Sequence, residues 1–124
     1  MKKLFEYLTE KIIKAFYKVY NTLGYGFLEK VYANALTIEL QNMGHIVEQE
    51  KPISVYDEQH EVGVYRSDVI VGSTVIAEIK AAEALIEAHN NQTIKDLKAT
   101  RMHIGLVLNF GPSPEVERVV LSMN

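Results

Sequence analysis

The stretch from Val62 to Ala81, VGVYRSDVIVGSTVIAEIKA, decides the fold class of this chain. Both halves are rich in Val and Ile, which favour strands, and the Gly72-Ser73 pair between them is typical of a turn. The stretch therefore predicts an antiparallel pair of strands, Val62–Val71 and Thr74–Ala81.

The segments on either side of this pair predict helices and further strands. Apolar residues recur at helical spacing in the first part of the chain and again before Gly44, a natural helix end. A Val- and Ile-rich segment that contains Pro52 predicts a strand at an edge or broken near the proline. The predicted elements are helix Leu4–Tyr20, helix Phe27–Met43, strand His45–Tyr56, helix Ile86–Thr100, buried strand His103–Asn109 and a tail, Glu115–Leu121, of undetermined type.

This order of elements, α-α-β-β-β-α-β plus a short tail, indicates the architecture. Three consecutive strands followed by a helical crossover to a buried strand require a mixed sheet with helices packed against it. We therefore expect an α/β fold of the α+β kind. At 124 residues the chain has the usual length of one domain, which we place at residues 1–124.

The composition excludes several classes of protein. The sequence contains no Cys, which excludes disulfides, thiolate zinc sites, iron–sulfur clusters and cysteine nucleophiles. A cysteine-free chain suits a reducing compartment, so we expect a cytoplasmic protein. The net charge of −3 argues against binding to phosphates by bulk charge. No apolar run approaches the ~18 residues of a membrane span, and the scattered histidines predict no zinc site.

Three charged residues, Asp68, Glu78 and Lys80, interrupt the apolar runs of the central strand pair. Burying such charges is costly unless they are paired or bind a metal. Strand alternation places Glu78 and Lys80 on one face. Two carboxylates beside an ammonium can hold Mg²⁺ or Mn²⁺ and orient a water. The alternative is a cross-strand salt bridge in a half-exposed sheet.

The length of the turn decides whether these side chains can meet. A two-residue turn at Gly72-Ser73 would place Asp68 opposite Ala77 and send Glu78 to the other face of the sheet. The metal hypothesis therefore requires a three-residue loop, a bulge, or a bend near Asp68.

Glu29 is a further candidate ligand. At helical spacing it shares a face with the apolar residues Tyr32, Leu36, Leu40 and Met43, where a carboxylate needs a partner. It is either a third metal ligand or an acidic residue that the dipole of the predicted helix stabilises near its start.

Basic residues form two candidate tracks for a nucleic-acid backbone. Lys95, Lys98 and Arg101 recur every third residue near the end of the third predicted helix, and Lys14 and Lys18 lie on the polar side of the first. The alternative for both sets is an ordinary solvated helix face.

The segment Gly26–Tyr32 has the form G-x-x-E-x-x-Y. Together with Arg66-Ser67-Asp68, Glu78-Ile79-Lys80, Gln92 and Leu108-Asn109-Phe110-Gly111, it resembles the small GxxExxY proteins. These are grouped with the PD-(D/E)XK nuclease superfamily, which has a restriction-endonuclease-like fold. The chain departs from many of these nucleases four residues after the glutamine, where Asp96 replaces an aromatic residue.

The resemblance implies a metal-dependent phosphodiesterase site. Asp68 and Glu78 would bind Mg²⁺ or Mn²⁺, and Lys80 would position or help activate the attacking water. Glu29 would be an additional ligand or would hold a metal-bound water. Gln92 would support the site or contact the nucleic acid.

We therefore expect a nuclease that acts on DNA, with RNA as the second choice. The alternative is a catalytically silent nuclease-like module that acts through a protein or nucleic-acid partner. A third possibility is a homodimer that completes a nucleic-acid cleft only when paired.

Overall fold

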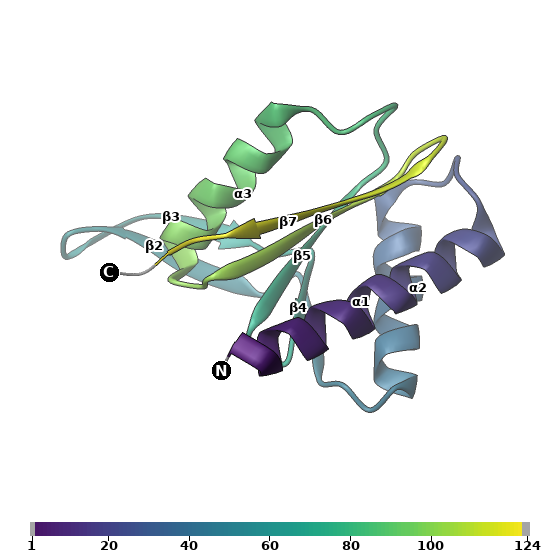
Figure 1. The fold of residues 1–124 in the computed structure, drawn as a ribbon. Coiled ribbons are helices and arrows are strands. Elements are labelled where there is room, and N and C mark those ends of the chain that lie inside the picture. Colours follow the sequence, from purple (N-terminus) through teal and green to yellow (C-terminus); the bar gives the residue numbers. More distant parts are fainter. Residues whose placement is uncertain (1, 123–124) are drawn as a thin grey trace.

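The computed structural model describes residues 2–122, and Met1, Met123 and Asn124 lie outside this range. Within it the chain forms three helices and seven strands (Figure 1). In chain order these are α1 (Lys2–Leu23), α2 (Glu29–Asn42), β1 (Val47–Gln49), β2 (Pro52–Asp57), β3 (His60–Arg66), β4 (Val69–Val71), β5 (Val75–Lys80), α3 (Glu87–Thr100), β6 (Ile104–Phe110) and β7 (Pro114–Val120).

Five of the strands form one mixed sheet in the order β1-β4-β5-β6-β7. Strands β5 and β6 are parallel and are joined through α3, whereas the other neighbours are antiparallel. Helices α1 and α2 cover one face and α3 covers the other (Figure 1). The predicted α+β fold, with a mixed sheet flanked by helices, is therefore confirmed, and the undetermined tail is strand β7.

Two of the predicted strands are each divided in two. The break near Pro52 is one of the two predicted alternatives, whereas the break in Val62–Val71 corrects the prediction of one continuous strand. His45–Tyr56 breaks at Glu50-Lys51, and Val62–Val71 breaks at Ser67-Asp68. Glu50 has a φ of 52°, a left-handed conformation that ends a strand. Hydrogen bonds from Glu50 N to Asp68 O and from Ser67 N to Lys51 O hold the two breaks side by side. The inner halves join the main sheet, and the outer halves form the separate β2–β3 hairpin next to α3 (Figure 1).

The turn between β4 and β5 has three residues. Val71 pairs with Val75, and Val69 pairs with Ala77. Gly72 and Ser73 both take left-handed conformations, with φ of 58° and 56°. The ladder ends at Val69 and Ala77, and Asp68 and Glu78 are the next residues along the two strands, so the turn length that the metal hypothesis requires is present.

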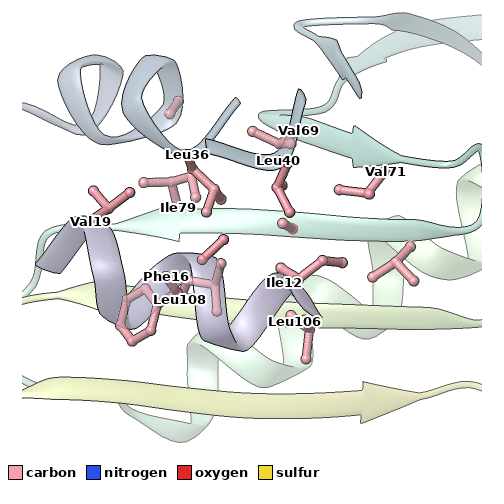
Figure 2. Close-up of a cluster of buried hydrophobic side chains, with 14 of the residues drawn as sticks. Ile12, Phe16, Val19, Leu36, Leu40, Val69, Val71, Ile79, Leu106 and Leu108 are labelled. Carbon is pink, nitrogen blue, oxygen red and sulfur yellow. The ribbon is translucent and has the colours of Figure 1, made fainter. Parts of the chain in front are cut away.

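The two faces of the sheet bury cores of different size. On the α1–α2 face, Ile12, Phe16, Leu36 and Leu40 pack against strand residues such as Leu106 (Figure 2). The α3 face has a smaller core, made of Ile70, Ile76, Leu97, Val107 and Val119. None of the helices described combines the length and apolarity that a membrane crossing requires.

Candidate active site

Glu78 lies on the α3 face of the sheet, because it alternates with Ala77 and Ile79, whose side chains pack on the other face. It is only 6% exposed. The hydroxyl of Tyr65, on β3, donates a hydrogen bond to Glu78 Oε1 at 2.9 Å. The bend of the long hairpin thus brings a tyrosine from β3 onto a carboxylate of β5.

The surroundings of Glu78 disfavour its anion. Burial, the neighbouring carboxyl of Asp96 and the charge of Asp68 raise the pKa of Glu78 to about 8, although the hydrogen bond from Tyr65 opposes the shift. Burial and the Glu78 carboxylate in turn raise the pKa of the Tyr65 hydroxyl. Glu78 therefore occupies a site with excess negative charge, which a bound cation would relieve.

Asp68 lies at the break between β3 and β4, and its Oδ2 accepts the Ile79 N–H at 2.8 Å. Its carboxylate therefore sits against the β5 backbone, one residue beyond Glu78. Burial raises the pKa of Asp68, whereas this hydrogen bond and the charge of Lys80 lower it. The charge of Asp68 in turn raises the pKa of Glu78, so the two carboxyl groups influence each other electrostatically.

Glu29 is the first residue of α2 and is exposed, whereas Tyr32, Leu36 and Leu40 on the same helix are buried. The expected apolar face is therefore real, but Glu29 lies at its open end. Glu29 and Asp68 line one cavity of about 210 Å³, together with Lys30, Gln49 and Glu50. Glu78 does not line this cavity.

Lys80 ends β5 and is partly exposed. Alternation places it on the face of Glu78. The ion pairs of the described residues are Lys18–Glu39, Lys30–Glu50 and Lys51–Glu48, so Lys80 is bonded to neither candidate carboxylate. The charge of Lys80 nevertheless lowers the pKa of Asp68, although the two groups form no direct ion pair.

Gln92 is connected to the site through Asp96, the residue that stands where many of these nucleases have an aromatic residue. Its Nε2 donates to Asp96 Oδ1 at 3.0 Å, and Asp96 is 8% exposed beside Glu78. Asp96 and Tyr65 are the two site residues that sequence reasoning missed. The spacing of four between Gln92 and Asp96 on one helix face was the signal for the first.

The five basic residues do not form one track. Lys95, Lys98 and Arg101 lie at exposed positions of α3 and its C-terminal cap. Lys14 and Lys18 lie on α1, on the opposite face of the sheet, where Lys18 pairs with Glu39 at 2.8 Å. Only the first set shares a sheet face with Glu78.

The remaining motif residues fasten the loops at this end of the sheet. The Tyr32 hydroxyl donates to Gly24 O at 2.7 Å and accepts the Phe27 N–H, and its ring stacks on Phe110. The buried Asn109 side chain donates to Ala82 O and accepts the Ala82 N–H. The loops before Glu29 and after Lys80 are thus each held by a motif residue.

The carboxylates of Asp68 and Glu78 suit a cation that takes only one or two ligands from the protein. Across residues 2–122 there is no group of three or more acidic or histidine side chains that could hold a metal ion. Asp68 and Glu78, however, are carboxyl groups whose pKa values are both raised, and the charge of Asp68 contributes to the shift of Glu78. One or two carboxylates, with water and substrate phosphate, are the usual ligands of Mg²⁺.

Comparison with known proteins gives one match. A family model described as the PD-(D/E)XK nuclease superfamily matches residues 6–119. No curated protein and no solved structure gives a significant match. The match concerns the superfamily, and the narrower resemblance to the GxxExxY proteins stays a prediction.

Proposed function

This chain belongs to the PD-(D/E)XK nuclease superfamily, and from that premise we propose that it is a divalent-metal-dependent nuclease that hydrolyses phosphodiester bonds in DNA. RNA is the second candidate substrate. The observation that supports the proposal is the three-residue turn, after which Asp68 and Glu78 directly follow the last paired residues, Val69 and Ala77. A cytoplasmic location stays a proposal that rests on the cysteine-free composition.

Asp68 and Glu78 would hold Mg²⁺ or Mn²⁺. When bound, such an ion neutralises charge on the scissile phosphate and lowers the pKa of a water. The protein's own groups do the rest. Lys80 contributes an ammonium that stabilises negative charge on the phosphate. Glu29, across the cavity from Asp68, accepts a hydrogen bond from a water and orients it. Asp96, held by Gln92, and Tyr65 position Glu78.

Calorimetric titration of the purified protein with Mn²⁺ and Mg²⁺ tests the metal site. We expect saturable binding that Asp68→Asn and Glu78→Gln each weaken by at least about tenfold, since each removes one charged ligand. Asp57→Asn and Glu61→Gln are matched controls, because both carboxylates are exposed on the β2–β3 hairpin. Cleavage of labelled DNA and RNA in the presence of the metal then tests the reaction and ranks the two substrates.

One observation favours the second candidate function, a catalytically silent nuclease-like module. Glu78 faces α3, whereas Glu29 and Asp68 line a cavity beside α2. If the protein binds nucleic acid or a protein partner but binds no metal at millimolar concentration, the silent module is correct and the nuclease proposal is wrong. A dimer would appear in the same samples by sedimentation.

A further inference from the structure

A groove of about 410 Å³ lies between strand β2 and the last turn of α3. Ile53–Tyr56 form one wall and Lys98–Arg101 form the other. Figure 1 shows the hairpin that carries β2 extending beside the C-terminal end of α3. Helix α3, which forms one wall, packs on the sheet face that also carries Glu78.

The lining of this groove combines positive charge with an exposed aromatic ring. Lys98 and Arg101 are its charged residues, and neither forms an ion pair with another described residue. Tyr56 is 60% exposed. The acidic residues Asp57 and Glu61 lie beside Tyr56 at the outer end of the hairpin, so they border the groove there. Cations next to a flat apolar ring match a phosphate next to a base.

The groove adjoins the candidate active site. Ile53 in the groove wall pairs with Tyr65, whose hydroxyl bonds to Glu78. On the opposite wall, Lys98 follows Asp96 by two residues, and Thr100 lies about one helical turn, roughly 5 Å, beyond it. A single residue, Tyr65, therefore connects one wall of the groove to Glu78.

The size of the groove selects the form of the nucleic acid. A volume of this order holds a ligand of about nucleotide size, whereas a base can stack on Tyr56 only when it has left a duplex. We propose that the β2–α3 groove binds a single-stranded segment of nucleic acid, with its phosphates on Lys98 and Arg101 and a base on Tyr56. This inference rests on the proposed function and names the substrate class of the same site.

Fluorescence anisotropy in EDTA tests the groove without catalysis. The probes are a short labelled oligothymidylate, the same strand annealed to oligoadenylate, and an oligouridylate. We expect the single strands to bind more tightly than the duplex. Tyr56→Ala should weaken single-strand binding by roughly 5- to 100-fold, as expected for loss of one stacked base. Lys98→Gln combined with Arg101→Gln should lower the slope of log K against log salt by about 0.7 per cation removed.

Matched variants test whether the loss of single-strand binding comes from the groove itself. Tyr56→Phe keeps the ring and should bind like wild type. Tyr7→Ala removes a tyrosine that is 55% exposed on α1, outside the groove, so it should not change binding. Oligouridylate binding as tight as oligothymidylate would assign the groove to single strands of either sugar.

Two results would overturn the inference. One is duplex binding at least as tight as single-strand binding, and the other is wild-type affinity in both Tyr56→Ala and the double variant. Because EDTA removes divalent metal, these readouts do not depend on catalysis. Metal-dependent cleavage without binding in the groove would support the proposed nuclease and contradict the single-strand groove. Binding in the groove without metal affinity would support the groove and contradict the nuclease.

Discussion

Glu78 lies between two other acids, Asp68 and Asp96, and Tyr65 donates a hydrogen bond to it. Its pKa is raised from 4.5 to about 8. Between these two values the folded state holds a proton that the unfolded state has released. The free energy of unfolding must therefore fall as pH rises through this window.

The first prediction concerns this slope. In EDTA we expect the free energy of unfolding to fall between about pH 5 and pH 8 by about 1.4 kcal/mol per pH unit for this one proton. Glu78→Gln keeps the shape and the acceptor but has no charge to titrate. Its slope should be flatter, and it should be more stable than wild type at pH 8. Urea unfolding at several pH values, followed by circular dichroism, measures both quantities.

The exposed Glu61→Gln variant is the control for this experiment and should keep the wild-type slope. If Glu78→Gln also keeps that slope, Glu78 does not carry the raised pKa.

At the scale of single residues, the sequence predicts the charged groups better than their partners. Asp68, Glu78 and Lys80 stand out because charges inside apolar runs need an explanation. Tyr65 does not, because it reaches Glu78 only after the hairpin has bent. Asp96 is one of several polar residues on its helix, and its burial depends on how α3 packs.

At the scale of elements, the approach of α3 to β6 positions Asp96. A Cβ on Gly105 would lie 2.8 Å from Thr93 Cγ2 and 3.7 Å from Leu97 Cδ2, both on α3. The helix therefore rests on the bare backbone of Gly105. A larger residue there must push α3 outward or displace Thr93.

The second prediction follows from this contact. Gly105→Ala should lower the free energy of unfolding by about 1–3 kcal/mol, the usual cost of overpacking. The displaced helix should also move Asp96 away from Glu78, which should make the pH slope of stability shallower. The same urea titrations measure both effects.

Gly63→Ala is the matched control, because a Cβ there meets nothing within 4 Å. It should change stability by less than about 0.5 kcal/mol. Equal costs for the two variants would show that α3 does not press on Gly105.

The element boundaries also show where sequence patterns stop being informative. A break near Pro52 was predictable, and the structure has it at Glu50-Lys51. The matching break at Ser67-Asp68 contains neither Gly nor Pro. It follows from the partner strand, because the two breaks are hydrogen-bonded to each other. Pairing between distant segments, rather than local preference, sets this boundary.

At the scale of the whole molecule, the two faces of the sheet that carries Glu78 are covered by hydrophobic cores of unequal size. The core against α1 and α2 includes large buried side chains such as Phe16, Tyr32 and Phe110. The core against α3 has five buried residues, and β3 is almost entirely exposed. Local stability should therefore differ across the sheet.

The third prediction is a gradient of amide hydrogen exchange. We expect the amides of β5, β6 and the middle of α1 to exchange slowest, those of α3 faster, and those of the β2–β3 hairpin fastest. Exchange measured by mass spectrometry on the protein in EDTA checks this order. Addition of Mn²⁺ should slow exchange in α3 and at Tyr65, because a cation bound to Glu78 would stabilise the contacts of α3 and β3 with β5. Uniform protection across all elements would contradict the unequal layers.

The turn between β4 and β5 has a consequence for inheritance. Its third residue sets the register that pairs Val69 with Ala77 and makes Asp68 and Glu78 the next residues on the two strands. Loss of one codon between positions 72 and 74 would shift this register by one residue, while every residue of both motifs remained in the gene. In a lineage of such chains, the proposed activity would then disappear through a change of length that leaves the motifs intact. The length of the β4–β5 turn, as well as the motif residues, should therefore be compared when related sequences are classified as active or inactive.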